Sequence, residues 1–116
     1  MSWISESPLK FVYWKLAARA QAAMLMCHAA NIDYIWEEPQ EDWKSAKKNY
    51  PFGQLPCLKH HDKMIAQSGT ISRYCAHLSS LMPFDLFQQL DADMLMEFSN
   101  EIYNLFATAK YAGDDL

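Results

Sequence analysis

Glycine and cysteine are scarce in this sequence. Only 3 of its 116 residues are glycine and 3 are cysteine, whereas hydrophobic residues make up 51% of the chain. This composition excludes collagen-like, low-complexity and disordered sequence, and it predicts one folded core. The cysteines, Cys27, Cys57 and Cys75, include no Cys-x-x-Cys pair, which argues against a disulfide framework, a zinc knuckle and a dithiol redox site. We expect them to be buried structural thiols.

Long basic and long apolar runs are also missing. The 10 Lys and Arg residues against 14 Asp and Glu give a net charge of -4, and without a basic run we expect no nucleic-acid partner. No 18 apolar residues follow one another, and the first residues show no basic segment leading into an apolar one. We therefore expect no membrane span and a cytoplasmic protein.

The first third of the chain predicts a strand, a helix and a second strand. Residues 9–14 mix β-branched and aromatic side chains, residues 16–30 are rich in alanine, and residues 32–36 alternate as a strand does. Asn31 is the expected C-terminal cap of the helix. Because one helix joins the two strands, we expect a parallel βαβ unit.

The middle of the chain predicts a hairpin followed by a helix. Asp42 is expected to cap a short helical segment. Residues 57–60 and 63–66 are then expected to pair as antiparallel strands. From Gln67 the apolar residues follow helical spacing, and Ser79 closes that pattern. The expected order is βαβ, an irregular loop, then ββα.

The last predicted element is a helix over residues 84–111, ended by Gly113. At 1.5 Å per residue it would be roughly 40 Å long, which is longer than the body of about 80 residues before it can cover. We therefore expect its apolar stripe to meet a partner, either in a homodimer or in a larger assembly. Asp93, Glu97 and Glu101 form an acidic stripe, which is either a solvated face or a site for an ammonium group, a divalent cation or a basic partner.

Several positions suggest ligand chemistry, and each has a structural alternative. Tyr13 ends the first strand, where its phenol could donate to a ligand or its ring could simply pack. Gln67-Ser68 begins a helix whose free N–H groups attract a carboxylate or phosphate, unless Ser68 is only an N-cap. The Leu55-Pro56 bond is open to either isomer. For His60-His61-Asp62 we expect a turn of ordinary surface histidines, not a metal site.

Four short motifs have specific sequences and spacings. They lie at residues 11–20, 42–47, 51–56 (Pro-Phe-Gly-Gln-Leu-Pro) and 67–74 (Gln-Ser-Gly-Thr-Ile-Ser-Arg-Tyr). Together they resemble the amino-terminal domain of cytosolic glutathione transferases, above all the sigma class with its glutathione-dependent prostaglandin D synthases. The resemblance covers about residues 8–106. It implies an α/β fold, with a thioredoxin-like βαβ-ββα glutathione-binding domain at 8–80 and the first helix of a truncated all-helical domain at 83–112.

The resemblance also implies a glutathione site. Tyr13 would stabilise the thiolate with support from Arg19, and Glu101 would reach the γ-glutamyl ammonium of a partner subunit. Trp43 and Lys47 would contact the glycine end of the tripeptide. Gln54 and Leu55, ahead of a cis Pro56, would pair with the cysteinyl backbone. Gln67 and Ser68 would hold the γ-glutamyl carboxylate. Glu97 matches a position where some members hold a divalent cation, but we assign no metal site.

Three departures from the family pattern leave two functions open. Residues 17–21 are Ala-Ala-Arg-Ala-Gln where the family usually has Arg-Gly-Arg-Ala-Glu, and Glu101 replaces the usual aspartate. Complete transferases also have roughly as many residues again. The chain is therefore either a transferase that activates glutathione toward a hydrophobic electrophile, or a non-catalytic transferase-like module that serves as an interaction subunit of a larger assembly.

Overall fold

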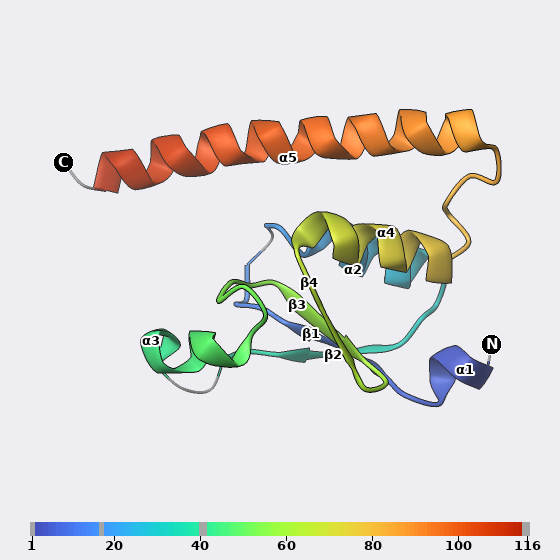
Figure 1. Ribbon diagram of the computed structural model, residues 1–116, viewed down its shortest axis with the longest axis horizontal. Coiled ribbons are helices and arrows are strands. Elements are labelled where there is room, and N and C mark those ends of the chain that lie inside the picture. The colour runs from blue at the N-terminus through green and yellow to red at the C-terminus, as the bar shows by residue number, and fades with distance from the viewer. Residues whose placement is uncertain (1, 17, 40–41, 115–116) are drawn as a thin grey trace. The chain divides into compact units, whose positions relative to one another are not determined.

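The computed structural model describes residues 2–16, 18–39 and 42–114. The chain divides into two compact units, residues 1–82 and residues 83–116. The first unit is a four-stranded sheet with helices, and the second is a single long helix (Figure 1). In chain order the elements are α1 (Ser2–Ser5), β1 (Leu9–Val12), α2 (Gln21–Ala29), β2 (Tyr34–Glu37), α3 (Trp43–Ala46), η1 (Lys47–Asn49), β3 (Cys57–His60), β4 (Lys63–Ala66), α4 (Ser68–Leu78) and α5 (Leu86–Asp114).

The sheet has the strand order β2-β1-β3-β4. β1 pairs in parallel with β2 and antiparallel with β3, and β3 and β4 form the predicted hairpin. The parallel pair needs a crossover connection, which α2 provides, whereas the antiparallel hairpin needs only a tight turn. The predicted α/β class and the βαβ-ββα order are thus confirmed.

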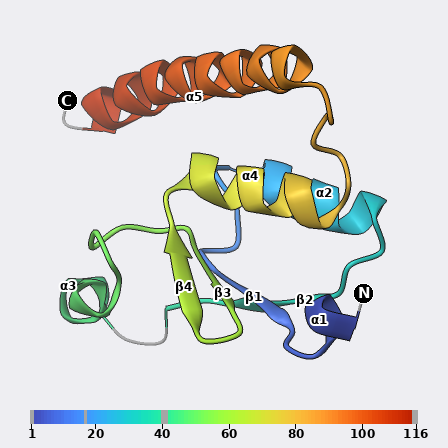
Figure 2. The same ribbon diagram turned by 45° about the vertical axis from the view of Figure 1, so that its right-hand side comes forward.

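The core of the first unit lies between the sheet and two helices. α2 and α4 pack side by side over one face of the sheet (Figures 1 and 2). Alternation along β1 turns Leu9 and Phe11 to this face, where both are fully buried with Leu58 and Ile71. Each such side chain contributes about 1.5–3 kcal/mol to folding. The predicted burial of all three cysteines is confirmed as well.

α2 is shorter at its start than the alanine content of the sequence predicts. It begins at Gln21 and not near residue 16, because the amide of Leu16 is bonded to the carbonyl of Trp14 in a turn. Its end is as expected: Asn31 takes a left-handed conformation (φ 55°), and the amides of Asn31 and Ile32 bond back to α2 carbonyls. This pattern is a Schellman motif, and asparagine tolerates the left-handed conformation that it needs.

His60 corrects the prediction of ordinary surface histidines. It is only 2% exposed, and its Nδ1 lies within hydrogen-bond distance of the Tyr74 hydroxyl. His61 follows in the hairpin turn, where its ring stacks on Trp3 and its Nε2 bonds the Trp3 carbonyl at 2.8 Å. The two histidines therefore attach α1 to the hairpin. Burial of an imidazole is possible here because both of its nitrogens have a polar neighbour, the second being the Ile4 carbonyl.

α5 extends beyond its predicted end. It begins after Asp85, whose carboxylate accepts a hydrogen bond from the Gln88 amide at 3.0 Å, as an N-cap does. Gly113 was expected to stop the helix but lies within it. A glycine ends a helix only when it adopts positive φ, and Gly113 does not. Within the described residues, no helix is sufficiently long and apolar to span a membrane.

Candidate functional site

The strand register gathers three of the predicted segments at one end of the sheet. Val12 pairs with Glu37 on one side and with Cys57 on the other, and Cys57 pairs with Ala66. These four residues form one row across all four strands. Tyr13, Pro56 and Gln67 each stand one residue beyond this row. In an open α/β sheet this position, outside the carboxyl ends of parallel strands, is where ligands bind.

Tyr13 continues β1 by one residue beyond the regular strand. Its amide donates to the Glu37 carbonyl at 3.1 Å, so its backbone is fixed by the sheet. The side chain is 5% exposed, and its ring contacts Trp14 and Trp36 at centroid distances of 5.6 and 6.3 Å. Both parts of the sequence prediction for Tyr13 fit this geometry, since the ring packs while the residue stands at the ligand-binding end of the sheet.

The loop before β3 contacts the start of α4. The side-chain amide of Gln67 donates to Gln54 Oε1 at 3.4 Å, although 13 positions separate the two residues in the chain. The intervening Leu55-Pro56 bond, which spacing alone left open, is cis. Gln54, Leu55, Pro56 and Gln67 are therefore brought together at one corner of the site.

Gln67 has an unusual backbone conformation. It precedes α4 with φ 76° and ψ 124°, in a region that L residues rarely adopt and that costs of order 1–3 kcal/mol. Ser68 is the first helical residue, which corrects its interpretation as an N-cap: Gln67 occupies the cap position and its side chain does not cap the helix. The first intrahelical bond runs from the Ile71 amide to the Gln67 carbonyl. The earlier amides and the positive end of the helix dipole thus face the site.

α3 holds two more of the predicted residues. Trp43 begins this helix after Asp42, whose carbonyl accepts from Ala46 but whose side chain does not cap as expected. The Trp43 ring makes an edge-to-face contact with Trp14 at 5.3 Å, which places α3 beside the end of β1. Lys47 follows α3 with an exposed side chain. Its ammonium group is one of the cations that this segment offers to an anion, beside those of Lys44 and Lys48.

Two of the predicted site residues are not among those that the structure brings together at this end of the sheet. Arg19 lies between β1 and α2 and is partly exposed. Glu101 lies on α5, in the second compact unit, so its role at a partner's site stays a prediction. Sequence analysis missed Trp14, whose ring connects Tyr13 to Trp43. The signal was present in the sequence as an aromatic residue directly after Tyr13.

The chain's own thiols are poor candidates for nucleophiles. Burial raises the pKa of Cys57, and Lys59 only partly opposes this effect. In the pair formed by Cys27 of α2 and Cys75 of α4, a hydrogen bond between the thiols lowers the pKa of Cys27 and raises that of Cys75. Both residues are at most 1% exposed. The site is therefore suited to hold a thiol supplied by a ligand, beside a phenol, with a cradle of amides for a carboxylate.

The fold and the site define a thioredoxin-like domain of the transferase type, and comparison with known proteins agrees. The family described as "Glutathione S-transferase, N-terminal domain" matches residues 8–77. The chain is 31% identical over 104 residues to glutathione S-transferase 2 of Manduca sexta, which covers 90% of this chain and 51% of that protein. This chain belongs to the glutathione S-transferase family.

Solved structures show the same fold. The Pi-class glutathione S-transferase of Onchocerca volvulus superposes with a TM-score of 0.79 at 28% identity, covering 85% of this chain and 48% of that one. Prostaglandin synthase D of Nilaparvata lugens, at 22% identity over 87% of this chain and 51% of that one, shares the fold with a TM-score of 0.78. The chain spans about half the length of the relatives that it matches.

The strain at Gln67 predicts a gain in stability when it is removed. Gln67→Gly should raise the free energy of unfolding by about 1 kcal/mol, since glycine adopts positive φ without steric cost. Gln67→Ala is the matched control, because it shortens the side chain but keeps the Cβ and hence the strain. Urea denaturation of both variants measures the difference. Equal stability of the two variants would show that the backbone of Gln67 is not strained.

Proposed function

We propose that this chain binds glutathione at the end of the sheet where Tyr13, Gln54, Leu55, Pro56, Gln67 and Ser68 gather. The proposal rests on the register of the four strands, which pairs Glu37, Val12, Cys57 and Ala66 in one row. Tyr13, Pro56 and Gln67 each lie one residue beyond this row, at the same end of the sheet. Membership of the transferase family supports glutathione as the ligand. A cytoplasmic location and the sigma class are further expectations from the resemblance.

Each part of glutathione has a matching group in this arrangement. The γ-glutamyl carboxylate would lie at the N-terminus of α4, where Ser68 and free amides can donate hydrogen bonds to it. The backbone of Leu55 would pair with the cysteinyl residue. Trp43 and Lys47 would contact the glycine end, where the exposed ammonium group of Lys47 complements a second carboxylate. Arg19 would support the site from the segment before α2.

We also propose that Tyr13 activates the thiol of bound glutathione. A phenol O–H that donates to sulfur stabilises the thiolate more than the neutral thiol, so it lowers the thiol pKa. The thiolate then attacks a hydrophobic electrophile: a carbon–sulfur bond forms as the bond from that carbon to a leaving group breaks, the leaving group departs with the electron pair of that bond, and the thiol proton passes to solvent. We further propose that residues 8–80 form the glutathione-binding domain and that 83–112 form the first helix of a helical domain, as in longer transferases.

α5 is the proposed site of assembly. It carries an exposed apolar stripe that includes Met94, Phe98 and Leu105, each at least 58% exposed. Exposed apolar surface of this extent is typical of interfaces. We propose a homodimer as the partner arrangement, with Glu101 directed toward the glutathione of the other subunit.

Glutathione binding is tested directly by calorimetry with Ser68→Ala. Loss of a charge-assisted hydrogen bond should weaken binding by about 1–3 kcal/mol, or roughly five- to 150-fold in Kd. Ser99→Ala on α5 is the control, because its hydroxyl donates to the Leu95 carbonyl of its own helix. Absence of heat from the unaltered chain at millimolar glutathione would refute the binding proposal.

The role of Tyr13 is tested by Tyr13→Phe. Glutathione affinity should stay nearly constant, while the pKa of the bound thiol rises and the conjugation rate falls, since only the charged form loses an interaction. Thiolate absorbance against pH measures the pKa in the bound state, and Tyr103→Phe on α5 is the control. An unchanged thiol pKa in the Phe variant would remove Tyr13 from the mechanism. Binding without any conjugation by the unaltered chain would favour the non-catalytic module instead.

Assembly through α5 predicts that charge on the stripe dissociates the dimer. The double variant Phe98→Glu, Ile102→Glu should sediment as a monomer at tens of micromolar, because burying two carboxylates costs several kcal/mol. Ser99→Glu, Thr108→Glu carries the same added charge at exposed polar positions and should sediment as the unaltered chain does. A monomeric unaltered chain would contradict the proposal.

A further inference from the structure

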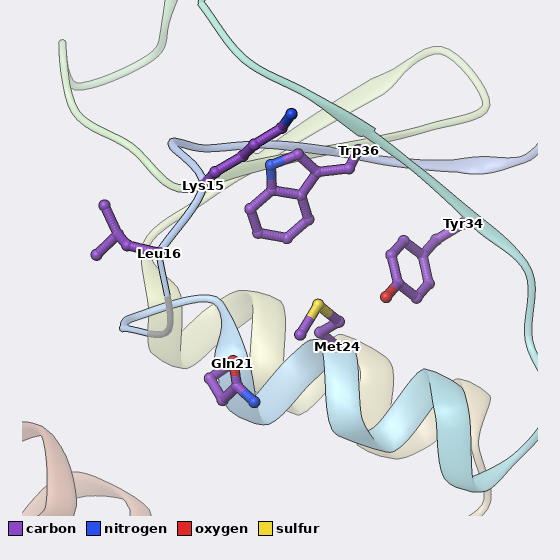
Figure 3. Close-up of a pocket in the computed structure, with 6 residues that line it drawn as sticks. All are labelled: Lys15, Leu16, Gln21, Met24, Tyr34 and Trp36. Atoms are coloured by element: carbon purple, nitrogen blue, oxygen red, sulfur yellow. The ribbon is translucent and has the colours of Figure 1, made fainter.

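A pocket lies in the first unit, on the face of the sheet that carries α2. It has a volume of about 470 Å³, and Figure 3 shows its lining: Lys15 and Leu16 from the segment after β1, Gln21 and Met24 from α2, and Tyr34 and Trp36 from β2. None of these six residues belongs to the proposed glutathione site. Tyr34 and Trp36 stand two positions apart on β2, so both rings point to the same face and form one wall.

One polar atom in this wall lacks a hydrogen-bond partner. The indole Nε1 of Trp36 is buried, and among the described residues it donates to nothing. A buried N–H without an acceptor costs about 1–3 kcal/mol, so such groups in native proteins require an explanation. The phenol of Tyr34, by contrast, is satisfied by His28 Nε2 at 2.7 Å. The pocket therefore presents an aromatic wall with one unused donor.

The same pocket is also lined by a cation. In Figure 3 the nitrogen-bearing edge of the Trp36 ring is on the side of Lys15, and both residues line the pocket. Lys15 is exposed and has no ion pair within the described part of the chain. A lysine side chain of this kind can reorient toward an anion in the pocket. The ammonium group, the indole N–H and the Gln21 amide all donate, so the pocket is suited to an acceptor that carries negative charge.

We propose that this pocket binds a small aromatic carboxylate. The rings of Tyr34 and Trp36 with the side chains of Leu16 and Met24 would contact the aromatic part, and the carboxylate would accept from Lys15 and the Trp36 indole. The volume accommodates one or two fused rings and leaves space for water. A neutral aromatic molecule would bind less well, because the buried donor would remain unpaired or would meet a weaker acceptor.

A ligand in this pocket would act on Tyr13 through the ring of Trp36. The rings of Trp36 and Tyr13 make an edge-to-face contact at 6.3 Å, and Trp36 also stacks on Phe11 at 6.0 Å. A ligand that fixes the Trp36 ring therefore acts one side chain away from the phenol proposed to activate glutathione. The binding proposal itself does not depend on glutathione binding, because the two sites share no residue.

The test is a titration of the full chain with 2-naphthoate, followed by the ¹⁵N–¹H signals of the tryptophan indoles. The signal assigned through Trp36→Phe should shift downfield and saturate, because its N–H gains an anionic acceptor. Saturating glutathione should change the apparent Kd of 2-naphthoate by less than about threefold from its value without glutathione. The uncharged 2-naphthylmethanol should bind at least fivefold more weakly than 2-naphthoate. The absence of a saturable shift, or displacement of 2-naphthoate by glutathione, would overturn the proposal.

Substitutions distinguish the contribution of the Lys15 charge to binding from that of the cavity itself. Lys15→Met should raise the Kd by about fivefold, the upper range for an exposed ion pair. Lys63→Met removes the same charge on β4, far from the lining residues, and should change the Kd less than twofold. Met24→Trp should abolish binding by filling the pocket, with a preserved backbone spectrum as evidence of folding. Equal affinity of the Lys15 and Lys63 variants would overturn the assignment of the carboxylate contact.

Discussion

The pairing of β1 on both of its edges is the constraint on which the rest of this structure depends. β1 is parallel to β2 and antiparallel to β3, and the two registers meet at Val12. A slip of one residue would exchange the faces of the sheet to which Phe11 and Val12 point, and would turn Phe11 away from α2 and α4, because side chains alternate along a strand. The same registers fix where Tyr13, Pro56 and Gln67 leave the sheet. Core packing and the position of the candidate site are therefore set together.

The strained backbone at Gln67 shows how the fold prepares an anion site. The conformation turns the chain sharply from β4 into α4, so that the helix begins at the ligand-binding end of the sheet. Strain of this kind persists only where the surrounding structure enforces it, and it is concentrated at functional sites. Here the contact between Gln67 and Gln54 helps to hold the turn. The strained turn places the N-terminus of α4 where a carboxylate can bind.

A set of aromatic side chains connects the two candidate sites. From Tyr13, ring contacts run through Trp14 to Trp43 in α3 and, in the other direction, to Trp36 in β2. The first path belongs to the proposed glutathione site and the second to the pocket over β2. Because aromatic rings pack closely and have few rotamers, a ligand that moved Trp36 would act on Tyr13 through their direct contact. The two sites are thus distinct in their residues but adjacent in space.

The sequence by itself determined the α/β class, the order of the strands and helices, the hairpin and the family. Periodicity and propensity are local, and the motif at 51–56 with the Gln-Ser pair at 67–68 is specific. Local signals could not place the start of α2, because the turn at Leu16 competes with the helix preference of alanine. They also could not show that Gly113 continues a helix, since glycine permits both outcomes.

Only the tertiary structure decided which distant groups meet. The burial of His60 depends on Tyr74 and on the backbone of α1, and Gln54 meets Gln67 although 13 positions separate them in the chain. The unused indole donor of Trp36 was likewise invisible in the sequence. Hydrogen-bond satisfaction is a property of three-dimensional neighbours, and sequence patterns report only which face of an element a residue occupies.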